Sequence, residues 1–333
     1  MLSRVANSIY WTNRYMERAE NYARFISVNL NMRLDLPPDV EERWDPLLVA
    51  TADHSLFYRY YDHPTRDNVV YFLTFDKQNP NSIASCLQAA RENARTIRET
   101  INNEMWESVN SLHLRLIEFA KLPSPDVTGN ARLFFDDIRN GCLLFQGIAD
   151  ATFTRNEAWH FGQIGRFLER ADKSSRFLDA KYFTLIHGQE QTNYLLELIV
   201  STAVLKSVGA YTMFRQTHKA LNRANIATFL ILDRLFPRTI VYSLLQAENS
   251  LYAVGGNRPV PDAANTAENL LTQLRSDVEH STQEEIFKNN LHHYLDWFQT
   301  RNNEVDNAIF NTYFDLKPAA EQLPGDQAQS RQA

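Results

Sequence analysis

The chain has 333 residues, of which 44% are hydrophobic and 22% charged, as in a globular protein with a sizeable core. Its formal net charge of −6 argues against a general nucleic-acid binder, because that role needs a basic face. Two cysteines, Cys86 and Cys142, are too few for a disulfide framework or a cysteine zinc site, and 10 glycines with 12 prolines favour long helices over many short strands.

The first half of the chain is dominated by helical periodicity. An amphipathic helix is predicted over 2–33, and the aromatic segment 40–63 is read as helical as well. The β-branched run within 65–76 has no partner strand elsewhere, so it is also predicted to be helix. After the start signal NPNS, one long helix is expected over 82–121.

The same periodicity continues through the second half of the chain. The helices predicted there cover residues 127–154, 157–187, 189–207, 222–236, 263–280 and 284–314. Asn156 and Asp262 are expected to cap the helices that follow them, and Pro237 is expected to open a further helix. The sequence therefore predicts an all-α protein, a single large multi-helix bundle over 1–316, followed by a disordered polar tail at 317–333.

Membrane association is not expected. The apolar runs are short and interrupted by charge, so none has the length of a membrane span. The N-terminus lacks the long apolar stretch of a signal peptide. These features predict a cytoplasmic protein that binds neither membrane nor nucleic acid.

One stretch of the first helix returns later in the chain: RYMERAENYARF at 14–25 is matched by RFLERADKSSRF at 166–177, with six of the twelve positions identical. The two copies share charged residues at Arg24 and Arg176 and at the eight positions that we take as the candidate cluster. These eight are Arg14, Glu17, Arg18 and Glu20 in the first copy and Arg166, Glu169, Arg170 and Asp172 in the second. We therefore predict an internal duplication of a charged helix, in which the helices around 2–33 and 157–187 belong to two related half-bundles fused into one body.

The charged face of the first copy also carries large aromatic residues. A helical wheel places Tyr10, Trp11 and Phe25 among the charges, away from a stripe around Tyr22 that is predicted to face the core. A solvated helix face rarely carries three large aromatics. The charged face is therefore expected to be partly covered, which requires its ions to be paired.

Two interpretations of the repeated charges stay open. In the structural one, the two copies pack against each other as a partly buried ion network that sets the register of the helices more than it adds stability. The pairs that it predicts are Glu17 with Arg166 or Arg170, and Glu169 with Arg14 or Arg18. In the other interpretation the cluster is a binding site, because arginine forks hold carboxylate or phosphate in two-point geometry while carboxylates take amines or metals.

Other candidate sites are weaker. Glu157 and His160 form a Glu-x-x-His pair, but di-iron helical bundles use that motif twice and it occurs once here. The adjacent Asp136 and Asp137 are interpreted as charges on a helix surface. The chain has no Walker motif, no glycine-rich dinucleotide loop and no nucleophile elbow. We therefore predict no cofactor and no metal site.

Four blocks of the sequence resemble the bacterial alpha-E domain family, a set of α-helical proteins of unknown function. These blocks are MLSRVANSIYWTNRYMERAENYAR at the N-terminus, ARENARTIRETINNEMWESVN at 90–110, WHFGQIGRFLERADKSSRFLD at 159–179 and FLILDRLFPRTIVYSL at 229–244. They occur in the family's order and span nearly the whole chain. The resemblance implies genes that lie beside, or are fused to, those of circularly permuted ATP-grasp proteins and transglutaminase-like proteins.

The gene neighbours of the family indicate the function that the resemblance implies. It suggests an accessory protein that works with an ATP-grasp ligase, and with a transglutaminase-like protein, in ATP-dependent peptide or amide-bond synthesis or peptide modification. The positions that it marks are Glu17, Glu20, Glu169 and Asp172, beside Arg14, Arg18, Arg166 and Arg170. These residues would hold a peptide, another carboxylate-bearing ligand or the partner itself.

Two alternatives assign chemistry to the same charges. In the first, the chain is an enzyme in its own right, with Glu17 or Glu169 as general acid or base and arginines that stabilise an anionic intermediate. In the second, it is a metal-dependent helical bundle that uses these two glutamates with Glu157 and His160. The lack of a catalytic motif favours the accessory role over both.

Overall fold

The computed structural model describes residues 1–37, 43–121, 131–186, 194–256 and 266–315, and all regular structure within these ranges is helical. The elements are α1 (Ser3–Met32), η1 (Arg33–Asp35), α2 (Asp45–Thr51), α3 (His54–Phe57), α4 (Arg66–Thr74), α5 (Ile83–Thr96), α6 (Asn103–Ala120), α7 (Ala131–Thr152), α8 (Glu157–Ile186), α9 (Tyr194–Ser207), α10 (Tyr211–Thr217), α11 (Arg223–Leu232), α12 (Ile240–Val254), α13 (Thr266–Glu279), α14 (Gln283–Phe287), α15 (Leu291–Ile309) and η3 (Phe310–Phe314). The predicted all-α class is confirmed.

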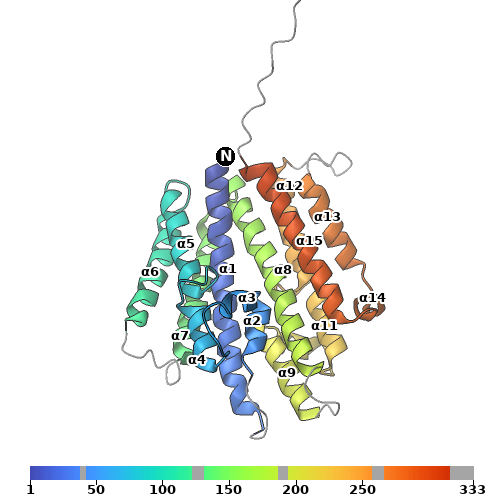
Figure 1. Cartoon of the computed structure of the whole chain (residues 1–333). Coiled ribbons are helices and arrows are strands. Elements are labelled where there is room, and N and C mark those ends of the chain that lie inside the picture. The colour runs from blue at the N-terminus through green and yellow to red at the C-terminus, as the bar shows by residue number, and fades with distance from the viewer. Residues whose placement is uncertain (38–42, 122–130, 187–193, 257–265, 316–333) are drawn as a thin grey trace, which may run out of the picture.

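Two helices of 30 residues, α1 and α8, lie side by side at the centre of the bundle (Figure 1). On one side, α1 packs against α5 and α7, and α6 covers these two from outside. On the other side, α8 packs against α12 and α15. Because α1 is surrounded, it is buried beyond the predicted stripe: Tyr22 is in the core, and so are Tyr10 and Phe25 on the charged face.

Local contacts and backbone angles fix several helix boundaries, among them the predicted cap Asn156. The Asn156 side chain accepts a hydrogen bond from the Trp159 backbone N–H, 3.2 Å away, at the start of α8. Thr65 caps α4 in the same way, so the β-branched run at 65–76 is helical. Gly209, which follows α9, has φ +66, a left-handed conformation that a glycine adopts without strain.

Two predictions of one long helix were wrong. The segment 82–121 is divided into α5 and α6, because the Asn102 side chain accepts a hydrogen bond from the Met105 N–H and begins a new helix there. The segment 284–314 is divided into α14 and α15. Asn290, with φ +84, stands between them and caps α15 through the His293 N–H. In both places a side-chain cap competes with continuation of the helix.

Smaller corrections concern the connections. The segment 40–63 contains two short helices, α2 and α3, separated by Ala52 in a left-handed conformation of φ +63. Pro237 does not open a helix, because α12 begins later, at Ile240, with Thr239 as its cap. Helix α10 was not predicted as a separate element. The predicted cap Asp262, the helix start at 127 and the tail at 317–333 lie outside the described residues, and the division at 316 stays a prediction.

Membrane-spanning potential was assessed helix by helix. Within the described ranges, no single helix is both long and apolar enough to cross a membrane. The pair formed by α9 and α10 reaches the required length and composition only when its two helices are taken together, and the chain bends by 113° between them.

Candidate functional site: a buried ion cluster between α1 and α8

The repeated charges meet in reciprocal ion pairs between the two central helices. Arg170 donates from Nε and Nη2 to the two carboxylate oxygens of Glu17, and both distances are 2.7 Å. In the opposite direction, Arg18 donates from Nε and Nη2 to the oxygens of Glu169, at 2.6 and 2.9 Å. Arg14 Nε adds a third hydrogen bond to Glu169, at 3.0 Å. Of the predicted pairs, the structure therefore forms Glu17 with Arg170, and Glu169 with both Arg14 and Arg18.

A glycine of α8 and a pair of stacked phenylalanines allow α1 and α8 to approach each other closely. A Cβ atom at Gly165 would collide with the backbone carbonyl oxygen of Tyr10, so a larger residue at 165 would push the helices apart. Farther along, the rings of Phe25 and Phe177 stack with centroids 4.2 Å apart. These two phenylalanines are equivalent positions of the repeated stretch. The contacts are reciprocal, while the duplication of a whole half-bundle stays a prediction.

Further charges surround the central pairs. On α1, Glu20 pairs with Arg24 one turn later and accepts a hydrogen bond of 2.8 Å from Arg238 Nη2. On α8, Asp172 pairs with Lys173 at 3.0 Å and with Arg176 at 2.9 Å. We call the whole group the ion cluster. Its members are Arg14, Glu17, Arg18, Glu20, Arg24, Glu169, Arg170, Asp172, Lys173, Arg176 and Arg238.

Arg238 is the member of the ion cluster that lies outside the repeated stretch, and the repeat gave no sign of it. It comes from the turn before α12 and is buried, and its Nη1 lies 3.0 Å from Asn21 Oδ1 and 3.5 Å from Glu17 Oε1. It therefore joins α12 to the pairs of the two central helices. The only signal that could have pointed to it was its place in the family-like block at 229–244.

Arg166 departs from the predicted pattern. Arg14, its equivalent in the first copy, binds a central glutamate, whereas Arg166 Nη1 lies 3.2 Å from Asp150 of α7 and 3.5 Å from Gln163. Burial lowers the pKa of the Arg166 guanidinium, and the neighbouring positive charge of Arg170 lowers it further. Of the two partners predicted for Glu17, the structure therefore pairs it with Arg170, while Arg166 pairs with Asp150 instead.

The electrostatics of the cluster keep its two central carboxylates, on Glu17 and Glu169, ionised. Burial raises the pKa of Glu17, but Arg170 and Arg238 together outweigh this effect and hold it at about 2. Burial likewise raises the pKa of Glu169, and Arg18, Lys173 and Arg14 bring it well below the ordinary value. A general acid or base works best with a pKa near the working pH. The pKa values of Glu17 and Glu169 are instead lowered, which moves them away from the neutral range.

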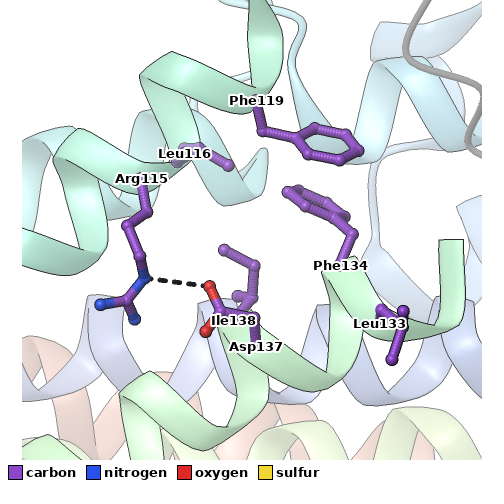
Figure 2. A pocket seen from close by; sticks show the side chains of 7 residues that line it. All are labelled: Arg115, Leu116, Phe119, Leu133, Phe134, Asp137 and Ile138. Carbon is purple, nitrogen blue, oxygen red and sulfur yellow. Dashed lines mark hydrogen bonds and ion pairs between the residues drawn. The ribbon is translucent and has the colours of Figure 1, made fainter. Parts of the chain in front are cut away.

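The ion cluster lines neither of two cavities found among the described residues. One cavity of about 310 Å³ lies between α6 and α7 (Figure 2) and the other, of the same volume, lies between the end of α1, α9 and the start of α7. The side chains of Glu17 and Glu169 are only 2% and 1% exposed. Among the described residues these two glutamates are thus enclosed by protein, and neighbouring cations neutralise their charge.

The residues proposed for metal binding do not converge. In the part of the chain that the structure describes, no three histidine, cysteine, aspartate or glutamate side chains are grouped so that they could hold a metal ion. Glu157 instead pairs with the N-terminal amine at 2.8 Å. Asp136 pairs with Arg139 at 2.9 Å and Asp137 with Arg115 at 3.0 Å, as expected for surface charges on a helix.

Comparisons with known proteins add a family and distant relatives. The sequence model of Alpha-E, described as a predicted alpha-helical domain with a conserved ER motif, matches residues 1–314. Two Glu-Arg dipeptides of this chain, 17–18 and 169–170, supply the central pairs of the ion cluster.

Among the curated relatives are uncharacterised proteins of Mycobacterium bovis and of two Mycobacterium tuberculosis strains, CDC 1551 and H37Rv. Each is 21% identical over 299 residues, which cover 85% of this chain and 33% of the relative. The chain therefore spans about a third of the length of these relatives. No solved structure matches it.

Proposed function

Because the chain belongs to the Alpha-E family, we propose that it is a non-catalytic helical protein that acts with an ATP-grasp ligase in ATP-dependent peptide or amide-bond synthesis or peptide modification. The observation that carries the non-catalytic part is the closed pairing of the ion cluster. Both oxygens of Glu17 and of Glu169 are held by arginines of the opposite helix. Carboxylates that are paired in this way, buried and lowered in pKa are poorly suited to take a proton from a substrate.

The cluster instead supports a structural role. Buried ion pairs add little net stability, because the cost of removing the charges from water offsets most of their attraction. They do make any other register of α1 against α8 costly, since a shift would leave several buried charges without partners. We infer that the cluster holds the two central helices, and through Arg238 also α12, in one fixed arrangement.

The length of the relatives supports a function that is carried out together with other protein domains. In the mycobacterial relatives the region similar to this chain is one third of a longer polypeptide, so a domain of this kind is there joined covalently to other protein. A rigid helical body attached to further domains is suited to holding a partner or a substrate in place. We choose the ligase as the partner because genes of this family lie beside those of ATP-grasp proteins. For the same reason we propose a transglutaminase-like protein as a second partner.

The test is association with a circularly permuted ATP-grasp protein encoded in the same genome. The full chain and this protein are mixed at micromolar concentrations, with and without ATP and Mg²⁺, and followed by size-exclusion chromatography with light scattering. We expect a complex of defined stoichiometry that a matched unrelated ATP-grasp ligase does not form. Elution as two separate species under both conditions would refute the proposed partnership.

Catalysis by the chain itself is tested separately. Glu17→Gln in the complex should leave product formation by the ligase unchanged as long as the variant folds, because Glu17 does not act on substrate in this proposal. Loss of activity with an unchanged melting temperature and unchanged complex formation would favour the general-base alternative. The readout is amide-bond formation measured as ADP release and product mass.

A further inference from the structure

A cavity of about 310 Å³ lies outside the ion cluster. It is lined by the C-terminal end of α1, by the start of α7 and by α9. This volume is at the lower end of the range for small-molecule sites, which suits a ligand of one or two amino-acid residues rather than a large cofactor. Its apolar wall is formed by Val28, Met32, Ile199 and Ala203. The wall suits an aliphatic group.

The polar residues of the cavity carry more positive than negative charge. Lys206 of α9 and Arg132 of α7 both line it, whereas Asp35 is its one acidic lining residue. Arg132 is only loosely paired, because the carboxylate oxygen of Asp136 that it faces is 3.8 Å from its Nε. The cavity is therefore suited to a ligand that carries negative charge.

The amide side chain of Asn31 completes the polar lining. Its Nδ2 donates to the backbone carbonyl oxygen of Ser27 at 2.8 Å, which orients the side chain and leaves Oδ1 as an acceptor. Thr202 adds a hydroxyl group on the facing helix. The cavity therefore combines an aliphatic wall, two cations, one carboxylate on Asp35 and neutral hydrogen-bonding groups within one small volume.

We propose that this cavity binds the carboxy-terminal residue of a peptide with an aliphatic side chain. The carboxylate lies between Lys206 and Arg132, because charge-assisted hydrogen bonds from a lysine and an arginine suit an anion of this shape. The aliphatic side chain packs on the wall around Ile199, and the peptide N–H donates to Asn31 Oδ1. The choice of a peptide over other carboxylates rests on the proposed function, whereas the choice of an apolar carboxylate rests on the cavity alone.

The second cavity, between α6 and α7, lacks this selectivity. Its one cation and its one carboxylate, Arg115 and Asp137, neutralise each other at 3.0 Å, as Figure 2 shows. The rest of its lining is apolar, with the rings of Phe119 and Phe134 stacked at a centroid distance of 4.1 Å. No charge is left among its lining residues to select an anionic ligand.

The test is isothermal titration calorimetry on the full chain without any partner protein. The probe is N-acetyl-L-alanyl-L-leucine, and its carboxamide analogue, which has the same shape but no charge, is the matched control ligand. We expect saturable one-site binding of the acid and a loss of about tenfold or more in affinity for the amide. Lys206→Gln should weaken binding of the acid by a similar factor, while Lys288→Gln, which removes an exposed lysine at the end of α14, should leave it unchanged.

Three results would overturn the proposal: no saturable heat with the acid up to millimolar concentration, equal affinity for acid and amide, or equal losses in the two lysine variants. Octanoate distinguishes the source of the carboxylate, because binding as tight as that of the peptide would assign the cavity to fatty acids instead. Circular dichroism melting confirms that each variant is folded. Since no ligase is present, a negative result here leaves the association experiment above unaffected.

Discussion

The centre of the bundle and its α6–α7 edge hold helices together by different means. At the centre, α1 and α8 are joined by ion pairs whose carboxylates, on Glu17 and Glu169, are almost fully buried. At the edge, α6 and α7 are joined by stacked phenylalanines, and their ion pair is half exposed, with Arg115 at 47% and Asp137 at 51%. Ion pairs of similar length therefore have different effects: buried pairs enforce one arrangement of the helices, whereas exposed pairs add little stability.

The largest expected effect comes from removing one carboxylate at the centre. Glu169→Ala leaves the mostly buried Arg18 without its anionic partner and leaves Arg14 with Asp306 alone, at 2.6 Å, and we expect a loss of about 3–5 kcal/mol in the free energy of unfolding. Glu17→Ala should cost a similar amount through Arg170. Urea unfolding followed by circular dichroism measures both. A loss below about 1 kcal/mol in either variant would show that the central pairs do not constrain the fold.

A smaller loss in the free energy of unfolding is expected when the central helices are pushed apart without any change of charge. Gly165→Ala places a methyl group against the Tyr10 carbonyl oxygen, and overpacking of this kind costs about 1–3 kcal/mol. Gly147→Ala on α7 is the matched control, because a Cβ there meets nothing within 4 Å. The control should be neutral or stabilising by up to about 1 kcal/mol, since alanine favours helix. Equal effects of the two substitutions on the melting temperature would contradict the close approach of α1 and α8.

Acid should weaken the centre of the bundle. The pKa of Glu17 is about 2 in the folded protein and about 4.3 in an unfolded chain, so its contribution to stability is present above about pH 4.3 and is lost as the pH falls toward 2. Glu17→Gln removes this titration. Over that pH range its unfolding free energy should fall less steeply than that of the wild type, by at most about 1.4 kcal/mol per pH unit. Parallel pH profiles of the two proteins would rule out the depressed pKa.

The smallest effect is expected at the edge. Asp137→Asn breaks the half-exposed pair with Arg115, and exposed pairs of this kind contribute about 0.2–1 kcal/mol. The difference should shrink in about 1 M salt, where exposed charges are screened. The central variants should keep most of their loss under the same conditions. A salt-insensitive loss above about 2 kcal/mol for Asp137→Asn would remove the distinction between the two regions.

Much of the central interface could be predicted from the repeated stretch. The spacing of Arg14, Glu17 and Arg18 on one helix face, with aromatic neighbours, predicted a covered and paired face, and the reciprocal partners on α8 are present. Arg238 could not be found in this way, because it reaches the cluster from a turn 217 residues beyond Asn21 along the chain. Periodicity reports which residues share a helix face, but it says nothing about which distant turn comes to lie against that face.

The sequence by itself determined the helical class and the two charged helix faces, because both follow from local periodicity and from the identity of side chains one turn apart. Only the tertiary structure decided that Arg166 binds Asp150 rather than Glu17, that the glutamates are sealed away from both described cavities, and that Lys206 and Arg132 line one cavity together. The physical reason is that burial and partner choice depend on the packing of helices far apart in the chain, which sets both the local dielectric and the distance between charges.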